Sequence, residues 1–271
     1  MAEWSKAYAW RAYEEQSSQS SNLCVSAINI MENRLTFDDI LNGKLKLLQP
    51  IKGPRVNLDT ILLSSWVKIR RNDSKILEAG CASGAISLIL AIKFKNADIT
   101  GIDIQEDLIG VSKLNSKNNN LEEHVKFIAG DLRDKNLLPR EYFDVIVINP
   151  PYSSLNSSRE SENLSRSTAR LELNCNIKDV AELSKRVLKS KGRLFSVFTS
   201  ERLDEFLASM REYKIIPKKI KFVYPDINKN SAIFLIECIK DGGEGLTILP
   251  PLIVRDENNN YTEELKGAYE I

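Results

Sequence analysis

Residues 75–84 read KILEAGCASG and decide how the chain is expected to fold. The largely apolar start, Lys75–Ala79, predicts a buried strand, and the small residues after it predict a turn where backbone can approach a ligand closely. Residues 84–94 then place apolar side chains every three to four positions, which predicts a helix. Dinucleotide enzymes use a related turn, but Ala82 replaces the middle glycine of their G-x-G pattern. Taken alone, the turn fits either a cofactor other than a nicotinamide dinucleotide or simple tight packing.

The alternation of strand and helix continues after this turn. Short apolar runs predict strands, and longer segments with a period near 3.6 predict helices. The expected strands are residues 99–103, 125–129, 144–148 and 193–199, and the expected helices are residues 107–117, 177–188 and 202–213. Residues 220–224 and 232–239 predict an antiparallel pair at the end of the sheet. This order predicts an α/β fold whose mostly parallel sheet is covered by helices on both faces.

Two aspartates follow successive predicted strands. Asp103 ends the second strand, where a carboxylate can accept hydrogen bonds from both hydroxyls of a ribose, although a helix N-cap is an alternative role. Asp131 follows the third strand, where its side chain could reach an adenine amino group of the same ligand. Because the carboxyl ends of parallel strands share one edge, both residues and the turn are expected to face one crevice.

The most specific motif is Asn149-Pro150-Pro151-Tyr152, directly after the apolar run 144–148. Two successive prolines fix the backbone and remove two amide donors, so carbonyl oxygens are left to accept hydrogen bonds. The Asn149 side chain and the Pro150 carbonyl could then hold an exocyclic amino group with its lone pair directed at a methylsulfonium. Tyr152 would supply a flat surface for stacking of a base. A rigid turn without chemistry is the alternative.

Composition excludes several other classes. The formal net charge of +1 gives no global footprint of a nucleic-acid binder, so any RNA site must be a local patch. The single histidine, His124, precedes an apolar strand, which argues against a histidine-dependent triad. No run approaches the roughly 18 apolar residues of a membrane span, and no signal peptide is evident, so a cytoplasmic protein without a membrane partner is expected. No cysteine pair has C-x-x-C spacing, so no metal is expected.

In combination, these motifs resemble the Rossmann-like class I methyltransferases that modify planar nitrogen. This resemblance implies a seven-stranded, mostly parallel sheet with an antiparallel end strand, and S-adenosyl-L-methionine as the cofactor. More narrowly, residues 35–255 resemble the bacterial tRNA1(Val) (adenine-37-N6)-methyltransferases. The features that suggest this family are residues 55–59 before an apolar helix, the motif at 149–152, residues 169–172 and the ending at residues 246–254.

The resemblance also implies roles for individual residues. Asp59 and its neighbours would close over the cofactor, and Asn149, Pro150, Pro151 and Tyr152 would be the catalytic residues that hold the target base. The residues expected to bind the cofactor are Asp59, Glu78, Gly80, Ala82, Gly84, Asp103, Ile104, Asp131, Leu132 and Asn149. Two positions depart from the family pattern: Ala82 stands where glycine is commoner, and Leu171 stands where histidine usually precedes Glu172.

The implied partner is a tRNA anticodon stem-loop. Basic residues that could receive its phosphates include Arg159, Arg166, Arg170, Lys218 and Lys219, although charged residues are more often simply solvated. Residues 1–30 are expected to be a disordered extension and 31–74 a segment that closes over the cofactor. Residues 75–245 would be the methyltransferase domain and 246–271 a C-terminal tail. Whether the chain is a monomer or a homodimer is left open by the sequence.

Other functions fit the same motifs, and guanine N2 and DNA adenine methylation are among them. A glutamine N5-methyltransferase acting on release factors would use the same Asn149–Tyr152 loop on a side-chain amide. Such enzymes usually carry a separate N-terminal helical domain, which residues 1–54 are too short and too polar to form. A catalytically inactive assembly factor that binds cofactor and RNA is the second alternative, and an intact Asn149-Pro150-Pro151-Tyr152 motif argues against it.

Overall fold

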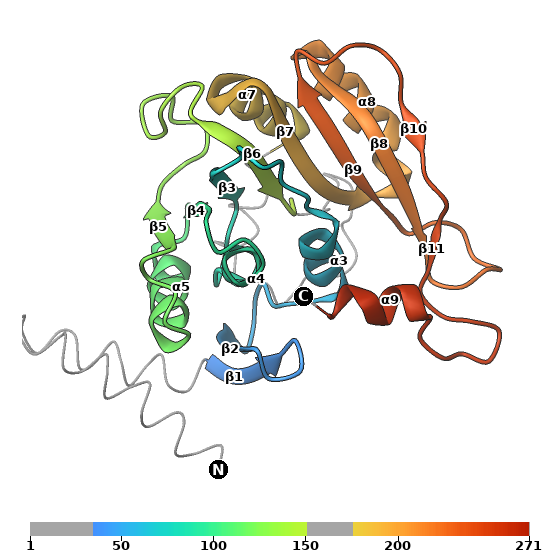
Figure 1. The fold of residues 1–271 in the computed structure, drawn as a ribbon, viewed down its shortest axis with the longest axis horizontal. Coiled ribbons are helices and arrows are strands. Elements are labelled where there is room, and N and C mark those ends of the chain that lie inside the picture. The colour runs from blue at the N-terminus through green and yellow to red at the C-terminus, as the bar shows by residue number, and fades with distance from the viewer. Residues whose placement is uncertain (1–34, 151–175, 271) are drawn as a thin grey trace, which may run out of the picture.

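The computed structural model describes residues 35–150 and 176–270, which form a β-hairpin and a large sheet flanked by helices (Figure 1). The elements are, in chain order, β1 (Leu35–Ile40), β2 (Leu45–Pro50), α3 (Leu58–Trp66), β3 (Lys75–Ala79), α4 (Ala85–Lys93), β4 (Asp98–Asp103), α5 (Glu106–Asn118), β5 (Val125–Ala129), β6 (Phe143–Ile148), α7 (Ile177–Val187), β7 (Leu188–Thr199), η1 (Ser200–Arg202), α8 (Leu203–Glu212), β8 (Ile215–Tyr224), β9 (Ile233–Lys240), β10 (Thr247–Ile248), β11 (Leu252–Ile253) and α9 (Glu263–Ala268).

The large sheet has the strand order β5-β4-β3-β6-β7-β9-β8, and both β10 and β11 pair with the outer side of β8. Strands β5, β4, β3, β6 and β7 are parallel, whereas β9 runs antiparallel between β7 and β8. The predicted α/β class with a mostly parallel sheet is confirmed. The antiparallel strand β9 lies between β7 and β8 rather than at the edge of the sheet. Pro250 and Pro251 divide the outermost segment into two short strands, since proline cannot donate to a ladder.

Each face of the sheet buries a separate apolar core. One core joins Ile76, Val145 and Val197 to α3, α4, α9 and the hairpin. The other joins Leu77, Ile146 and Leu194 to α7 and α8. Figure 1 shows α7 and α8 across the strands from α3 and α4. Since neighbouring residues of a strand point to opposite faces, continuous apolar strands are what a sheet covered on both sides requires.

Local sequence signals account for the starts of α3 and α7. Asn57 and Asn176 accept hydrogen bonds from the backbone N–H three residues later and so begin α3 and α7 with capping boxes. The helix predicted to reach residue 188 ends at Val187, because Leu188 already pairs with β6. Strand β7 is therefore longer than the predicted 193–199, and its ladder with β6 shifts register between residues 188 and 193.

Lys93 joins the C-terminal ends of α3 and α4. Its ammonium, at the end of α4, donates hydrogen bonds of 2.9 to 3.0 Å to the carbonyl oxygens of Ser64, Ser65 and Val67, at the end of α3. The C-termini of the two helices are therefore adjacent. The start of α3 lies near the turn after β3, because Gln49 accepts the Val56 N–H over 2.7 Å and the preceding residue, Leu48, is joined to the Ser83 carbonyl through Asn115.

The N-terminal hairpin is attached to the domain through α5. Asn115 Oδ1 accepts the Leu48 N–H over 2.7 Å, and its amide donates to the carbonyls of Leu48 and Ser83. Asn119 makes a similar pair of bonds to the backbone of Lys46. These amide contacts satisfy the edge of β2 and tie it to the turn that precedes α4.

Several predictions fall outside the described residues. These are the extension over residues 1–30, the residues Pro151 and Tyr152, the basic residues Arg159, Arg166 and Arg170, and the pair Leu171 and Glu172. Within residues 35–150 and 176–270, no helix has the length and apolar character needed to cross a membrane.

Candidate functional site

Four segments meet at the carboxyl edge of the parallel strands. In the sheet register, Ala79 lies opposite both Ile102 and Ile148, and Asp103 lies opposite Ala129. The turn after β3 is bonded to β4 through the Gly80 N–H and the Ile102 carbonyl, 2.8 Å apart. The turn and the two aspartate loops, which the sequence places at the ends of successive strands, therefore lie at one edge, and the Asn149 loop begins at the same edge.

The two glycines of the turn have different roles. Gly80 has φ +73°, and a Cβ added there would meet nothing within 4 Å, so this position faces open space. Gly84 has φ +83°, and a Cβ there would come within 2.7 Å of the Phe127 ring and 2.9 Å of Ser112. Gly84 thus permits close packing of α4 on β5 and α5. Of the two, Gly80 is the position that leaves room for a ligand.

Asp103 is buried at the end of β4 and organises the site. Its Oδ2 accepts the Ala82 N–H over 2.8 Å, and its Oδ1 accepts the Gln105 N–H over 2.9 Å. A carboxylate offers about four lone-pair positions, so two remain for ligand hydroxyls. Next to it, the Ile104 side chain is 41% exposed and offers an apolar surface to a flat ring. This combination fits the adenosine part of an adenosyl cofactor.

Glu78 is buried beneath the turn. Its Oε2 accepts hydrogen bonds from both the N–H and the hydroxyl of Ser87, the N–H over 2.7 Å. Burial raises the pKa of the Glu78 carboxyl to about 8, although the Ser87 hydrogen bonds lower this pKa in part. Glu78 therefore acts first as a cap for the first turn of α4.

The Asp131 side chain is held by Arg133, a neighbour that no sequence motif indicated. The Arg133 guanidinium donates to both carboxylate oxygens of Asp131, with Nε 2.9 Å from Oδ1 and Nη2 2.5 Å from Oδ2. These hydrogen bonds hold the pKa of Asp131 below its usual range. A ligand amino group would have to share this carboxylate with Arg133. Leu132, between them, packs against the core under α7 and α8.

The Asn149 loop begins where β6 ends at Ile148. Asn149 is half-buried and Pro150 is buried, and both lie at the carboxyl edge between the ends of β3 and β7. Asp59 lies in the first turn of α3, which reaches the same edge. The remaining two members of the motif, Pro151 and Tyr152, lie outside the described residues.

The two described lysines expected to contact RNA are engaged within the protein. Lys218 donates to the carbonyl oxygens of Gly243 and Glu244, and Lys219 pairs with Glu237 at 3.1 Å. Both lie in the N-terminal half of β8, away from the carboxyl edge. Among the described residues, no group of three or more histidine, cysteine or acidic side chains is arranged to hold a metal ion.

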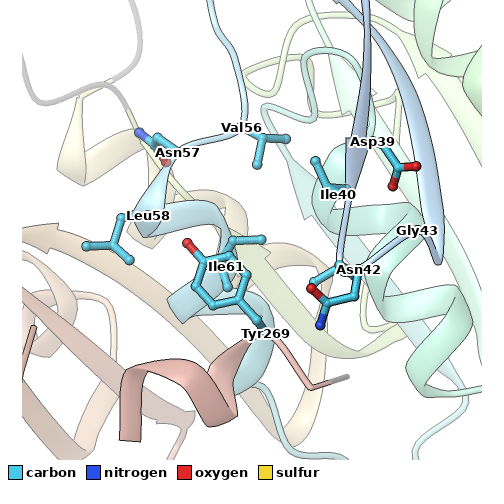
Figure 2. Close-up of a pocket in the computed structure, with 10 residues that line it drawn as sticks. Asp39, Ile40, Asn42, Gly43, Val56, Asn57, Leu58, Ile61 and Tyr269 are labelled. Carbon is cyan, nitrogen blue, oxygen red and sulfur yellow. The ribbon is translucent and has the colours of Figure 1, made fainter. Parts of the chain in front are cut away.

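A pocket that no sequence motif indicated lies beside this edge. It has a volume of about 560 Å³ and lies between the β1–β2 turn, the start of α3 and Tyr269 (Figure 2). Its walls come from segments between residues 39 and 61 and from Tyr269, which are far apart in the sequence, so no local pattern could reveal it.

Together, the sheet order, the turn after β3 and the residues at the carboxyl edge define a Rossmann-like methyltransferase domain. A family model described as a methyltransferase domain matches residues 70–249, and the chain belongs to this family. It is an S-adenosylmethionine-dependent methyltransferase. In agreement, a solved structure of a predicted O-methyltransferase from Agrobacterium tumefaciens shares the fold, with a TM-score of 0.64 and 18% identity over 78% of this chain and 95% of that one.

Curated relatives differ in how much of their length is matched. A tRNA1(Val) (adenine(37)-N6)-methyltransferase from Flavobacterium psychrophilum is 26% identical over 221 residues, which cover 79% of this chain and 92% of the relative. A release factor glutamine methyltransferase from Fusobacterium nucleatum is 29% identical over 81% of this chain and 59% of the relative. A bifunctional methyltransferase from Rickettsia bellii is 28% identical over 68% of this chain, which spans only 34% of that protein.

Proposed function

We propose that this enzyme methylates the exocyclic N6 of an adenine in tRNA, at position 37 of a valine tRNA, in the cytoplasm. The observation that carries the proposal is the position of Asn149 and Pro150 at the carboxyl edge, next to the turn at Gly80. The 92% coverage of the tRNA1(Val) relative supports the choice of substrate. S-adenosylmethionine, when bound, supplies an electrophilic methyl group.

In this proposal the protein acts mainly by positioning. Gly80, Ile104 and Asp103 would hold the cofactor, with Ala82, Gly84, Glu78, Asp131 and Leu132 shaping that half of the site. The Asn149 side chain and the Pro150 carbonyl oxygen would accept the two hydrogens of the adenine amino group, which directs its lone pair. The proton is lost once the methylated amine becomes acidic, so no general base is required.

The test is methyl transfer from radiolabelled S-adenosylmethionine to unmodified total tRNA, followed by nucleoside analysis. Wild-type protein should produce labelled N6-methyladenosine, and Asn149→Ala should reduce its rate at least 100-fold. Asn96→Ala is the matched control, because Asn96 is an exposed asparagine in the turn between α4 and β4, at the opposite edge of the sheet. It should retain wild-type activity. If the wild-type enzyme transfers no label to tRNA, the proposal is refuted.

Glutamine methylation of a release factor is the second candidate function. A Clostridium acetobutylicum release factor glutamine methyltransferase is 42% identical over 81 residues, although these cover only 30% of this chain. The same Asn149 and Pro150 acceptors could hold a side-chain amide. Label in a release factor, and none in tRNA, would establish this alternative.

A further inference from the structure

The pocket shown in Figure 2 lies beside the candidate methyl-transfer site. Its wall on one side comes from Val56, Leu58 and Ile61, at the start of α3. Because α3 begins at the carboxyl edge, this wall adjoins the edge that carries Gly80 and Asn149. The opposite wall comes from the β1–β2 hairpin and includes Asn42. The pocket thus lies between the hairpin and the start of α3.

The chemistry of the lining suits a flat ring with polar edges. In Figure 2 the Tyr269 ring lies beside Ile61, with Asn42 facing it from the hairpin. Tyr269 remains 37% exposed, so an aromatic face and an apolar wall are accessible together. Asn42 is exposed and has φ +56°, a conformation that asparagine tolerates better than most residues. Its amide can both donate to and accept from the edge of a base.

The lining of the pocket contains none of the residues that suit the cofactor. Gly80, Asp103 and Ile104, which suit the adenosyl group, do not line this pocket. Instead, the hairpin and the segment after it carry the exposed lysines Lys44, Lys46 and Lys52. None of these lysines lines the pocket, whose one charged lining residue is Asp39; Lys46 lies opposite Asp39 in the hairpin register. Exposed lysines on the same hairpin can receive phosphates that lie outside the pocket. RNA is commonly recognised by bases that are splayed out and stacked on aromatic side chains.

We infer that this pocket binds a second nucleobase of the RNA substrate, one that neighbours the methylated adenine, by stacking on Tyr269 and hydrogen bonding to Asn42. The inference rests on the proposed RNA substrate and adds to it a specificity site outside the Asn149 loop.

The test compares Tyr269→Leu, Tyr269→Phe and Asn42→Gly in the full-length protein. Leucine keeps the apolar contact but not the aromatic face, phenylalanine keeps both, and glycine removes the amide while tolerating the positive φ. Tyr142→Ala is the control, since Tyr142 is 40% exposed and immediately precedes β6, at the opposite edge of the sheet. The measurements are the KM for unmodified tRNA, kcat, and the calorimetric Kd for S-adenosylmethionine.

Tyr269→Leu should raise the KM for tRNA about tenfold, in line with the typical loss of one base stack, and leave the cofactor Kd unchanged. Asn42→Gly should also raise the KM for tRNA. Tyr269→Phe and Tyr142→Ala should behave as wild type. An equal weakening of cofactor binding would assign the pocket to the cofactor and overturn the inference. If the enzyme methylates tRNA and the variants keep the wild-type KM, the inference about the pocket is wrong but the proposed function stands. If the wild type is inactive on tRNA, the proposed function is wrong as well.

Discussion

The Ala82 N–H donates a hydrogen bond of 2.8 Å to Oδ2 of Asp103, which joins the turn after β3 to the end of β4. Ala82 makes this bond with φ +46°, in the left-handed region that favours glycine. Ala82 thus takes a conformation that glycine adopts without strain, and the Asp103 carboxylate supports both the turn and the surface on which the cofactor is proposed to lie.

Replacing Asp103 with asparagine should destabilise the protein. The amide nitrogen cannot accept, so one of the backbone donors at Ala82 and Gln105 loses its partner, at a cost of about 1–3 kcal/mol. Urea denaturation measures this change, and calorimetry should show at least tenfold weaker binding of S-adenosylmethionine. Asp98→Asn, at the other end of β4, is the control. Asp98 is an exposed partner of Lys75, and its loss should cost less than about 0.5 kcal/mol.

Ala82→Gly should stabilise the protein. Glycine removes the penalty of a left-handed alanine, about 1 kcal/mol, which corresponds to a rise in Tm of about 2–4 °C for a domain of this size. Differential scanning fluorimetry without cofactor is sufficient. Ala85→Gly, in the first turn of α4, should give no such gain, because that alanine is helical. A lower Tm for Ala82→Gly would show that the turn is not strained as the structure indicates.

Glu78 should make stability depend on pH. Its pKa is raised to about 8 in the folded protein, against 4.5 for an ordinary glutamate, mainly by burial. Between these values the folded state keeps a proton that the unfolded state has lost, so this group's contribution to stability is lost as pH rises from about 5 to 8. Glu78→Gln, which stays neutral, should flatten the profile of unfolding free energy against pH and stabilise most at pH 8.

The control for this profile is Glu122→Gln, because Glu122 is exposed in the segment before β5. It should leave the slope between pH 5 and 8 unchanged. If Glu78→Gln kept the wild-type slope, the carboxyl would be ionised in the folded protein over the whole range.

Lys93→Met should loosen the contact between α3 and α4. Methionine keeps the apolar stem but removes the donor to the Ser64, Ser65 and Val67 carbonyls, at a cost of about 1–3 kcal/mol. Hydrogen exchange should increase in the last turn of α3. Lys95→Met, at an exposed lysine two residues later, should change neither stability nor exchange. Equal protection of α3 in both variants would mean that packing alone holds the two helices together.

The sequence by itself was sufficient for the order of the main strands and helices and for the edge at which they meet. Buried parallel strands must be apolar, so the short apolar runs at residues 75–79, 99–103 and 144–148 are enough to predict strands there. The small-residue turn and the motif beginning at Asn149 then fall at the carboxyl edge by topology alone.

Only the tertiary structure decided what each residue at that edge contacts. Gly80 and Gly84 are alike in sequence, yet the Phe127 ring fills the space beside Gly84 and leaves Gly80 open. Arg133 donates hydrogen bonds to the Asp131 carboxylate, and the spacing of apolar residues does not predict this contact. The pocket at Tyr269 joins the two ends of the described chain. Some of these contacts join side chains that are distant in sequence, and others depend on which rotamer a side chain adopts. Neither property produces a periodic pattern in the sequence.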